Sequence, residues 1–279
     1  MNDHRALELY AQYRTHSQEP SPLTIVQAPN LSGGRTMHGT MIPFIEMASD
    51  FLRELFNSIN DFRRHINTLE AWRKVYESCG DEERLSILVE HVRPFATLAL
   101  SGPQAIRGRI MHAAAISCGH ANYVLHGRDS ALQWDGSGHL DMKLASKIGQ
   151  PWAGWKALAP LLSQKLGRGP IHQLTSDFRN QQEHGHPRNI GLGLTASVEI
   201  TKGSDGQRSW AIGARDAISI ETVVEQASAQ HALAVEAYEL LCALAKEQFE
   251  ALLVATSMLL PTVTAQNNNA LASGRAERL

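Results

Sequence analysis

Apolar residues recur at helical spacing over most of the chain, and this pattern predicts a mainly helical protein. The clearest segment is 42–78, whose apolar positions return every three or four residues: Phe44, Met47, Phe51, Leu55, Ile59, Phe62, Ile66 and Leu69. Gly80 is expected to stop this helix, and Asp81 to cap a further helix over 82–92. One face of each helix is therefore expected to be buried.

Prolines and glycines divide the rest of the helical pattern. Pro94 is expected to interrupt it, with a new helix over about 101–125. A further helix is predicted over 152–166. Pro170 suits the first turn of the next helix, and Pro187 is expected to close that helix by disfavouring helical geometry in the residue before it.

The last long element covers about 219–260 and is apolar on much of its circumference, so it is expected at the centre of a bundle. Before it, residues 194–202 alternate between apolar and polar, 203–206 are turn-forming, and 208–212 return. This predicts a small β-hairpin inserted in the bundle. Four tryptophans near this region are expected to pack under the hairpin: Trp134, Trp152, Trp155 and Trp210.

The chain is accordingly predicted to have four parts. Residues 1–40 carry many prolines and glycines and are expected to form an irregular N-terminal arm. Residues 41–100 form an N-terminal helical region, and 101–262 a helical bundle with the hairpin near 194–213. Residues 263–279 are expected to be a flexible tail.

Composition and charge narrow the functional classes. The formal net charge is −2, so a generally basic nucleic-acid coat is absent and any such binding must be local. The region 151–215 has eight Lys or Arg residues against four Asp or Glu. The three cysteines are far apart in the sequence and predict no disulfide framework. The sequence shows neither the apolar core of a signal peptide nor an apolar stretch long enough to span a membrane, so the cytoplasm is the expected location.

The most suggestive segment lies in this positive region and reads Asp177-Phe178-Arg179-Asn180-Gln181-Gln182-Glu183-His184-Gly185-His186-Pro187. On one helix Arg179 and His184 lie roughly 140° apart and do not share a face. Asn180 and His184 are four residues apart, so Asn180 is expected to hydrogen-bond the imidazole and fix its tautomer.

These two side chains make most chemical sense at a symmetric interface. A twofold axis beside the helix would bring both copies of Arg179 and His184 into one cleft. A histidine that titrates near neutrality can move protons between an RNA 2′-hydroxyl and a leaving oxygen. A guanidinium can hold the phosphate and stabilise its growing negative charge without a metal or another cofactor.

The pattern Arg179-Asn180-x-x-x-His184 resembles the signature of the HEPN superfamily (higher eukaryotes and prokaryotes nucleotide-binding). The resemblance implies a helical bundle that dimerises and, in many members, a metal-independent endoribonuclease of defence, toxin or RNA-processing systems. Carried over by position, Arg179 and His184 would be the catalytic pair and Asn180 its polar support, with Glu183 and His186 beside them. Some members have a tyrosine where this chain has His186.

The bare spacing also occurs at Arg107-Gly108-Arg109-Ile110-Met111-His112. The segment at Arg179 is favoured because Asn180 follows the arginine, apolar helical positions precede it, and a Gly-His-Pro break follows. Within the positive region, the residues expected to contact RNA are these three: Arg168, Arg188 and Lys165.

Simpler interpretations exist for the same residues. Arg179 is also four residues from Glu183, which suits an ordinary surface ion pair, and His184 suits a helix C-terminus because of the helix dipole. A metal site formed with His172 and His186 is disfavoured, since the spacing matches no known metal motif.

Three functions therefore stand as hypotheses. The first is a homodimeric, metal-independent endoribonuclease of HEPN type that acts at the dimer interface. The second is a non-catalytic module of the same fold that binds RNA, a nucleotide or a partner protein. The third is a structural protein whose helices only assemble. No membrane partner is expected, and the sequence identifies neither the RNA target nor a cognate partner or antitoxin.

Overall fold

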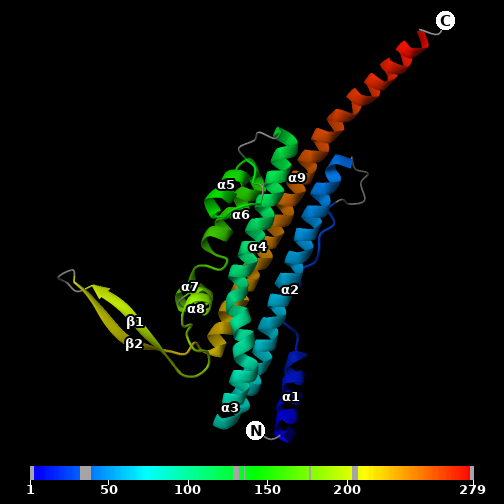
Figure 1. Cartoon of the computed structure of the whole chain (residues 1–279). Coiled ribbons are helices and arrows are strands. Elements are labelled where there is room, and N and C mark those ends of the chain that lie inside the picture. Colours follow the sequence, from blue (N-terminus) through cyan, green and yellow to red (C-terminus); the bar gives the residue numbers. More distant parts are fainter. Residues whose placement is uncertain are drawn as a thin grey trace. The chain divides into compact units, whose positions relative to one another are not determined.

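The computed structural model describes residues 3–31, 39–127, 132–134, 136–175, 177–202 and 207–276, with side chains throughout except at 40, 197–202 and 258–276. Its elements, in chain order, are α1 (Asp3–Ser17), a 3-10 turn (Gly39–Met41), α2 (Ile42–Ser78), α3 (Asp81–Ile87), a π turn (Leu88–Val92), α4 (Arg93–His126), α5 (Met142–Gly149), α6 (Ala153–Gln164), α7 (Pro170–Leu174), α8 (Phe178–His184), β1 (Leu194–Lys202), β2 (Arg208–Asp216) and α9 (Ile220–Ala276) (Figure 1). The prediction of a mainly helical bundle with a small β-hairpin is confirmed.

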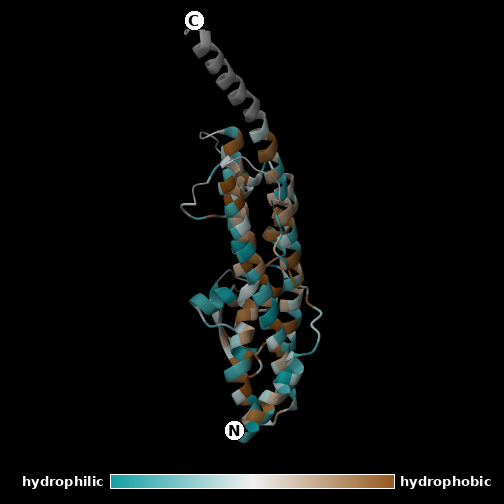
Figure 2. Ribbon diagram, turned by 90° about the vertical axis from the view of Figure 1, so that its right-hand side faces the viewer, coloured by the Kyte–Doolittle hydropathy of each residue, from teal (hydrophilic) through white to brown (hydrophobic). Residues whose placement is uncertain are grey.

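The chain folds as two compact units, each made of separate segments. Unit 1 comprises Met1–Val26, Asn57–Gly108 and Leu161–Glu236, and unit 2 comprises Gln27–Phe56, Arg109–Pro160 and Ala237–Leu279. Helices α2, α4, α6 and α9 contribute residues to both units. Apolar and polar residues interleave along the long helices, as expected where one helix face is buried (Figure 2).

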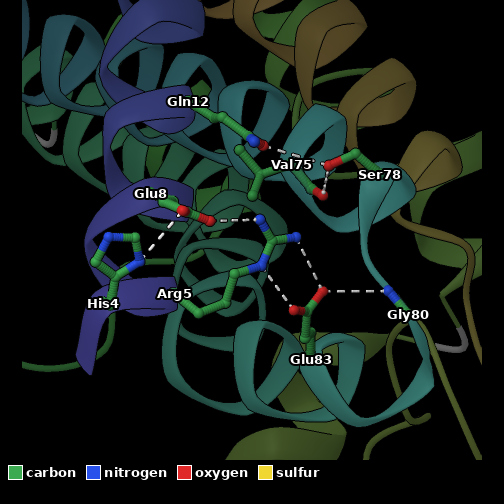
Figure 3. A network of polar contacts seen from close by, with 8 residues as sticks. All are labelled: His4, Arg5, Glu8, Gln12, Val75, Ser78, Gly80 and Glu83. Carbon is green, nitrogen blue, oxygen red and sulfur yellow. Dashed lines mark hydrogen bonds and ion pairs between the residues drawn. The ribbon is translucent and has the colours of Figure 1, made fainter. Parts of the chain in front are cut away.

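In unit 1, the N-terminal helix α1 replaces the irregular arm predicted for residues 1–40, so that prediction is wrong for Asp3–Ser17. Arg5 donates to both carboxylate oxygens of Glu83, over 2.7 and 3.3 Å, and to Glu8 over 2.9 Å (Figure 3). Tyr13 stacks on Trp72 at 4.5 Å. Contacts with Glu83 and Trp72 stabilise α1, and these residues are too far along the chain for the local sequence of α1 to indicate them.

The turn between α2 and α3 differs slightly from its prediction. Helix α2 covers the predicted range, but Gly80 is the N-cap of α3 and Asp81 is its first residue. The Glu83 carboxylate accepts the Gly80 N–H at 3.3 Å, which satisfies an amide that has no partner within the helix.

Pro94 does not interrupt the helical pattern, and no new helix begins near residue 101, so both predictions are wrong. A π turn directly precedes α4, and its wider ring gives space to a proline that lacks an N–H and would crowd the carbonyl four residues earlier. Gly102 lies inside α4, where an added Cβ would be 2.8 Å from the Phe62 ring. This glycine is therefore a close-packing position.

The single helix predicted between Pro170 and Pro187 is two helices, α7 and α8. Pro170 occupies the first turn of α7, as predicted. The break is marked by Asp177, whose φ of 55° and ψ of 55° place it in the left-handed region. A left-handed residue cannot continue an α-helix, so α8 starts in a new direction.

The hairpin is confirmed, with a return strand longer than predicted. Strands β1 and β2 pair antiparallel from Leu194 opposite Asp216 to Lys202 opposite Arg208, and the turn predicted at 203–206 lies outside the described residues. Trp210 is 71% exposed and is therefore not a core residue. The prediction of tryptophan packing under the hairpin is wrong for Trp210.

In unit 2, Trp152 and Trp155 are buried. The Trp152 indole N–H donates to Asn122 Oδ1 at 3.0 Å. Glu247 of α9 accepts the N–H groups of Ala153 and Gly154 at 2.9 and 2.8 Å, which caps the N-terminus of α6. The buried Gln248 of α9 donates to Cys118 Sγ of α4 at 3.0 Å, so α9 contacts both α6 and α4 within this unit.

Helix α9 continues beyond its predicted end near residue 260 and includes the segment 263–276 that was expected to belong to a flexible tail. Among the described residues, no helix is both long enough and apolar enough to cross a membrane.

Candidate functional site

A cleft of about 460 Å³ in unit 1 brings charged residues of four segments together. Its walls come from α4, the loop that follows α6, α7 with the break after it, and α8. The side chains that can carry chemistry are Arg107, Arg168, His172, Asp177, Arg179 and Glu183.

Two of the three arginines have no carboxylate partner among the residues that the structure describes. Arg107 uses its Nε–H to donate to the Leu162 carbonyl, which leaves both of its terminal nitrogens for another partner. Burial and then the positive charge of Arg168 lower the pKa of Arg107 from its ordinary value. Within the described part of the chain, no carboxylate pairs with Arg107 or Arg168. Their mutual repulsion would be relieved by a bound anion.

The position of Arg168 is set by the glycines on either side. Gly167 and Gly169 have φ values of +66° and +67°, which side-chain-bearing residues rarely adopt. The Gly167 N–H donates to Gln230 Oε1 at 2.7 Å, and an added Cβ would lie 3.0 Å from Gln104 Cα. The loop is therefore packed directly against α4, with the Arg168 side chain exposed at the cleft.

A histidine and a carboxylate of the cleft lining lie close to each other. His172 Nε2 lies 3.4 Å from Asp177 Oδ2, and Gln104 Nε2 donates to Asp177 Oδ1 at 3.0 Å. The Asp177 amide donates to the His172 carbonyl at 2.8 Å, so the break between α7 and α8 turns the carboxylate back toward the imidazole. Both oxygens of Asp177 are used, and the ring orientation of His172 is restrained.

The arginine of the sequence motif lines the same cleft. Arg179 Nε donates to Glu183 Oε1 at 2.9 Å, with 38% of the arginine side chain and 49% of the glutamate side chain exposed. This is the surface ion pair that the four-residue spacing allows. Asn180 also lines the cleft.

The histidine of the motif does not lie with its arginine. His184 is 74% exposed, its Nε2 is 3.9 Å from Glu183 Oε2, and it is not among the residues that line the cleft. Among the described residues its polar contact is with Glu183 and not with Asn180. His186 is exposed beyond the helix end. Pairing of Arg179 with a histidine from another copy remains a prediction.

The three residues expected to contact RNA lie in different settings. Arg168 lines the cleft, whereas Lys165 is exposed outside its lining. Arg188 is occupied: its guanidinium donates to the Leu174 carbonyl at 2.8 Å and to the Asp216 carbonyl at 2.6 and 3.1 Å. It holds the end of α7 to the base of the hairpin.

Sequence reasoning missed the parts of the cleft that come from distant segments. Arg107 belongs to the second Arg-x-x-x-x-His spacing, which was judged the weaker one, and His172 was weighed only as a metal ligand. The described residues contain no group of three or more His, Cys, Asp or Glu side chains that could hold a metal ion. The glycines at 167 and 169, which both have positive φ values, were a local sequence signal for an ordered loop at Arg168.

Comparison with family models, curated proteins and solved structures gave no match for this chain.

Proposed function

We propose that the cleft binds a phosphate group of RNA and that the protein is a metal-independent endoribonuclease of HEPN type, acting at a dimer interface. The supporting observation is that Arg107, Arg168 and Arg179 line one cleft, and that two of them pair with no carboxylate in the described part of the chain. The choice of RNA rests on the resemblance of Arg179-Asn180-x-x-x-His184 to the HEPN signature.

Phosphate suits the charge of the cleft better than a neutral ligand does. A guanidinium presents several N–H donors in a plane and holds phosphate oxygens through paired hydrogen bonds. Arg107 is already oriented by its bond to the Leu162 carbonyl, so its terminal nitrogens need little further ordering. With Arg168 beside it, the cleft offers donors to two oxygens of one phosphate.

Strand cleavage would use the same charge. The phosphate gains negative charge as a ribose 2′-hydroxyl attacks it, and fixed guanidinium groups stabilise that charge without rearranging. His184 lies one residue beyond Glu183, which lines the cleft, so a second copy docked at this end of α8 would place another titratable ring beside the first.

A second candidate function is RNA or nucleotide binding without cleavage. The observation that favours it is the position of the motif residues, since Arg179 is paired with Glu183 and His184 points away from the cleft lining. In that case the arginines bind phosphate and no proton transfer follows.

Fluorescence polarisation with a labelled single-stranded RNA, together with a gel assay for cleavage in EDTA, tests both functions. Arg107→Gln and Arg168→Gln are each expected to weaken RNA binding by about 10-fold, the effect of losing a charge-assisted contact of about 1.4 kcal/mol. Arg64→Gln is the matched control, because the Arg64 side chain is 70% exposed on α2 and is not among the residues that line the cleft. This variant should bind RNA as tightly as the wild type does.

Equal affinities for the two cleft variants and the Arg64→Gln control would contradict the phosphate site. Saturable binding without any loss of full-length RNA would favour the binding module. Cleavage in EDTA that requires Arg107 and Arg168 would support the endoribonuclease.

A further inference from the structure

We infer that His172, oriented by Asp177, is the acid–base residue of the cleft and takes the role that the motif alone would give to His184. This inference rests on the proposed ribonuclease function and deepens it. It assigns the proton transfer to a residue of α7 that lies outside the HEPN-like motif.

The pair leaves one ring nitrogen for proton transfer. Asp177 Oδ2 lies 3.4 Å from His172 Nε2, so the carboxylate faces that nitrogen and Nδ1 is the one left to act on a ligand. His172 is 40% exposed and lines the cleft, so Nδ1 can meet a ligand there. The Gln104 side chain holds the other carboxylate oxygen at 3.0 Å and fixes the plane of Asp177.

Asp177 is held in an uncommon conformation to make this contact. It has the one positive φ value, 55°, found among the non-glycine residues that the structure describes. Side-chain-bearing residues rarely adopt this conformation, and aspartate adopts it more readily than most, so contacts of Asp177 can hold it there. Those contacts are its amide bond to the His172 carbonyl and the Gln104 side chain.

The charged neighbours suit a proton-transfer role for His172. Arg107 of α4, Arg168 of the loop and Arg179 of α8 would hold the phosphate, while Asp177 faces the imidazole and Glu183 is taken by Arg179. A carboxylate on one ring nitrogen stabilises the imidazolium that forms when the other nitrogen accepts a proton.

His184 is less well placed. Its contact with Glu183 Oε2 is 3.9 Å long, its side chain is 74% exposed, and it is not among the residues that line the cleft. For cleavage within one copy of the chain, His172 is therefore the better placed of the two histidines.

The step can be written with its protons and bonds balanced. His172 Nδ1 removes the proton of the 2′-hydroxyl, and O2′ forms a bond to phosphorus while the bond from phosphorus to O5′ breaks. Because O2′ and O5′ lie on opposite sides of phosphorus, a water molecule protonates O5′, and the imidazolium then returns its proton to the resulting hydroxide. The products are a 2′,3′-cyclic phosphate and a 5′-hydroxyl end.

The test compares His172→Ala and His172→Gln with the matched control His139→Ala in two assays on the full chain: RNA affinity by polarisation and single-turnover cleavage in EDTA. Both His172 variants are expected to lower the cleavage rate by about 10²–10⁴-fold while leaving affinity within about threefold. His139 is exposed and is not among the residues that line the cleft, so His139→Ala should keep the wild-type rate. Circular dichroism melting of each variant checks that it is folded.

Asp177→Asn adds a readout that a structural role would not move. It keeps the side-chain shape but removes the charge that stabilises the imidazolium, so the single-turnover rate should fall while RNA affinity stays within about threefold. A folded Asp177→Asn variant that cleaves at the wild-type rate would overturn the positioning role.

Failure of the inference and failure of the proposed function give different results. Cleavage by the wild type that survives in folded His172 variants overturns the assignment to His172, and its loss in His184→Ala would then return the acid–base role to the motif histidine. A wild-type protein that neither binds nor cleaves RNA overturns both.

Discussion

At the scale of single residues, the motif could be recognised in the sequence but its partners could not. The ion pair of Arg179 with Glu183 follows from a four-residue spacing on a helix, and it is present. The contact of Asp177 with Gln104 joins residues 73 positions apart and needs a helix break to form. No local pattern encodes such a contact, so His172 could not be singled out in advance.

His231 provides a prediction for stability against pH. It is 1% exposed on α9, its Nε2 makes no hydrogen bond within the described residues, and burial followed by the charge of Arg63 lowers its pKa from 6.5 to about 4. Between these values the unfolded chain binds a proton that the folded chain does not. Stability should therefore be complete above about pH 6.5 and fall as the pH decreases toward 4, by up to about 3 kcal/mol.

Urea unfolding at several pH values between 4 and 7.5 measures this effect. Replacing His231 with Leu, which cannot bind a proton, should flatten the dependence, whereas the exposed His186→Leu control should retain it. An equally steep loss of stability in His231→Leu would assign the effect to other groups.

At the scale of elements, the sequence pattern predicted helices well where periodicity is long and unbroken. Helix α2 was predicted over its observed range because its buried positions return at regular spacing. Helix α1 was missed because its stability comes from Glu83 and Trp72, far along the chain. Pro94 misled the prediction because a π turn relieves the crowding that usually ends a helix at proline.

Substituting alanine for two glycines of α4 is expected to change the stability of the protein in opposite directions. A Cβ at Gly102 would lie 2.8 Å from the buried Phe62 ring, so Gly102→Ala is expected to destabilise the protein by about 1–3 kcal/mol through overpacking. At Gly108 nothing lies within 4 Å of an added Cβ. Gly108→Ala should stabilise the protein by about 0.5–1 kcal/mol, since alanine loses less backbone freedom in a helix.

Chemical unfolding of the two variants at one pH measures the change in the free energy of unfolding for each substitution. A stabilising Gly102→Ala would mean that the Phe62 ring moves aside at little cost, and α4 would then be packed more loosely than the structure indicates.

At the scale of the whole molecule, the candidate RNA site depends on the distribution of charge and on segments that are far apart in the chain. The formal net charge of −2 excludes a general attraction to nucleic acid, so RNA binding would have to come from the local excess of arginine in the cleft. That cleft draws on α4 and on residues 167–183, which the chain separates by some 60 positions. Sequence patterns predicted the helices, but they did not predict that these separate segments would line one cleft.

The division into two units also leads to a prediction about unfolding. The unit boundaries fall inside α2, α4, α6 and α9, so neither unit can unfold without breaking the hydrogen-bond ladder of continuous helices. Helix formation is cooperative, and each new helix end leaves backbone groups without partners. We therefore expect one transition for the whole chain in spite of its two compact units.

Cys79 in unit 1 and Cys118 in unit 2 are buried free thiols that can report on each unit. A short pulse of alkylating reagent at each urea concentration, followed by mass spectrometry of the two peptides, gives the fraction of each thiol exposed. The two curves should share one midpoint and one slope, because shared helices tie the exposure of both thiols to a single event. Midpoints separated by more than the error of the fit would mean that the two units unfold independently, and that the helices running through both can end at the boundary at little cost.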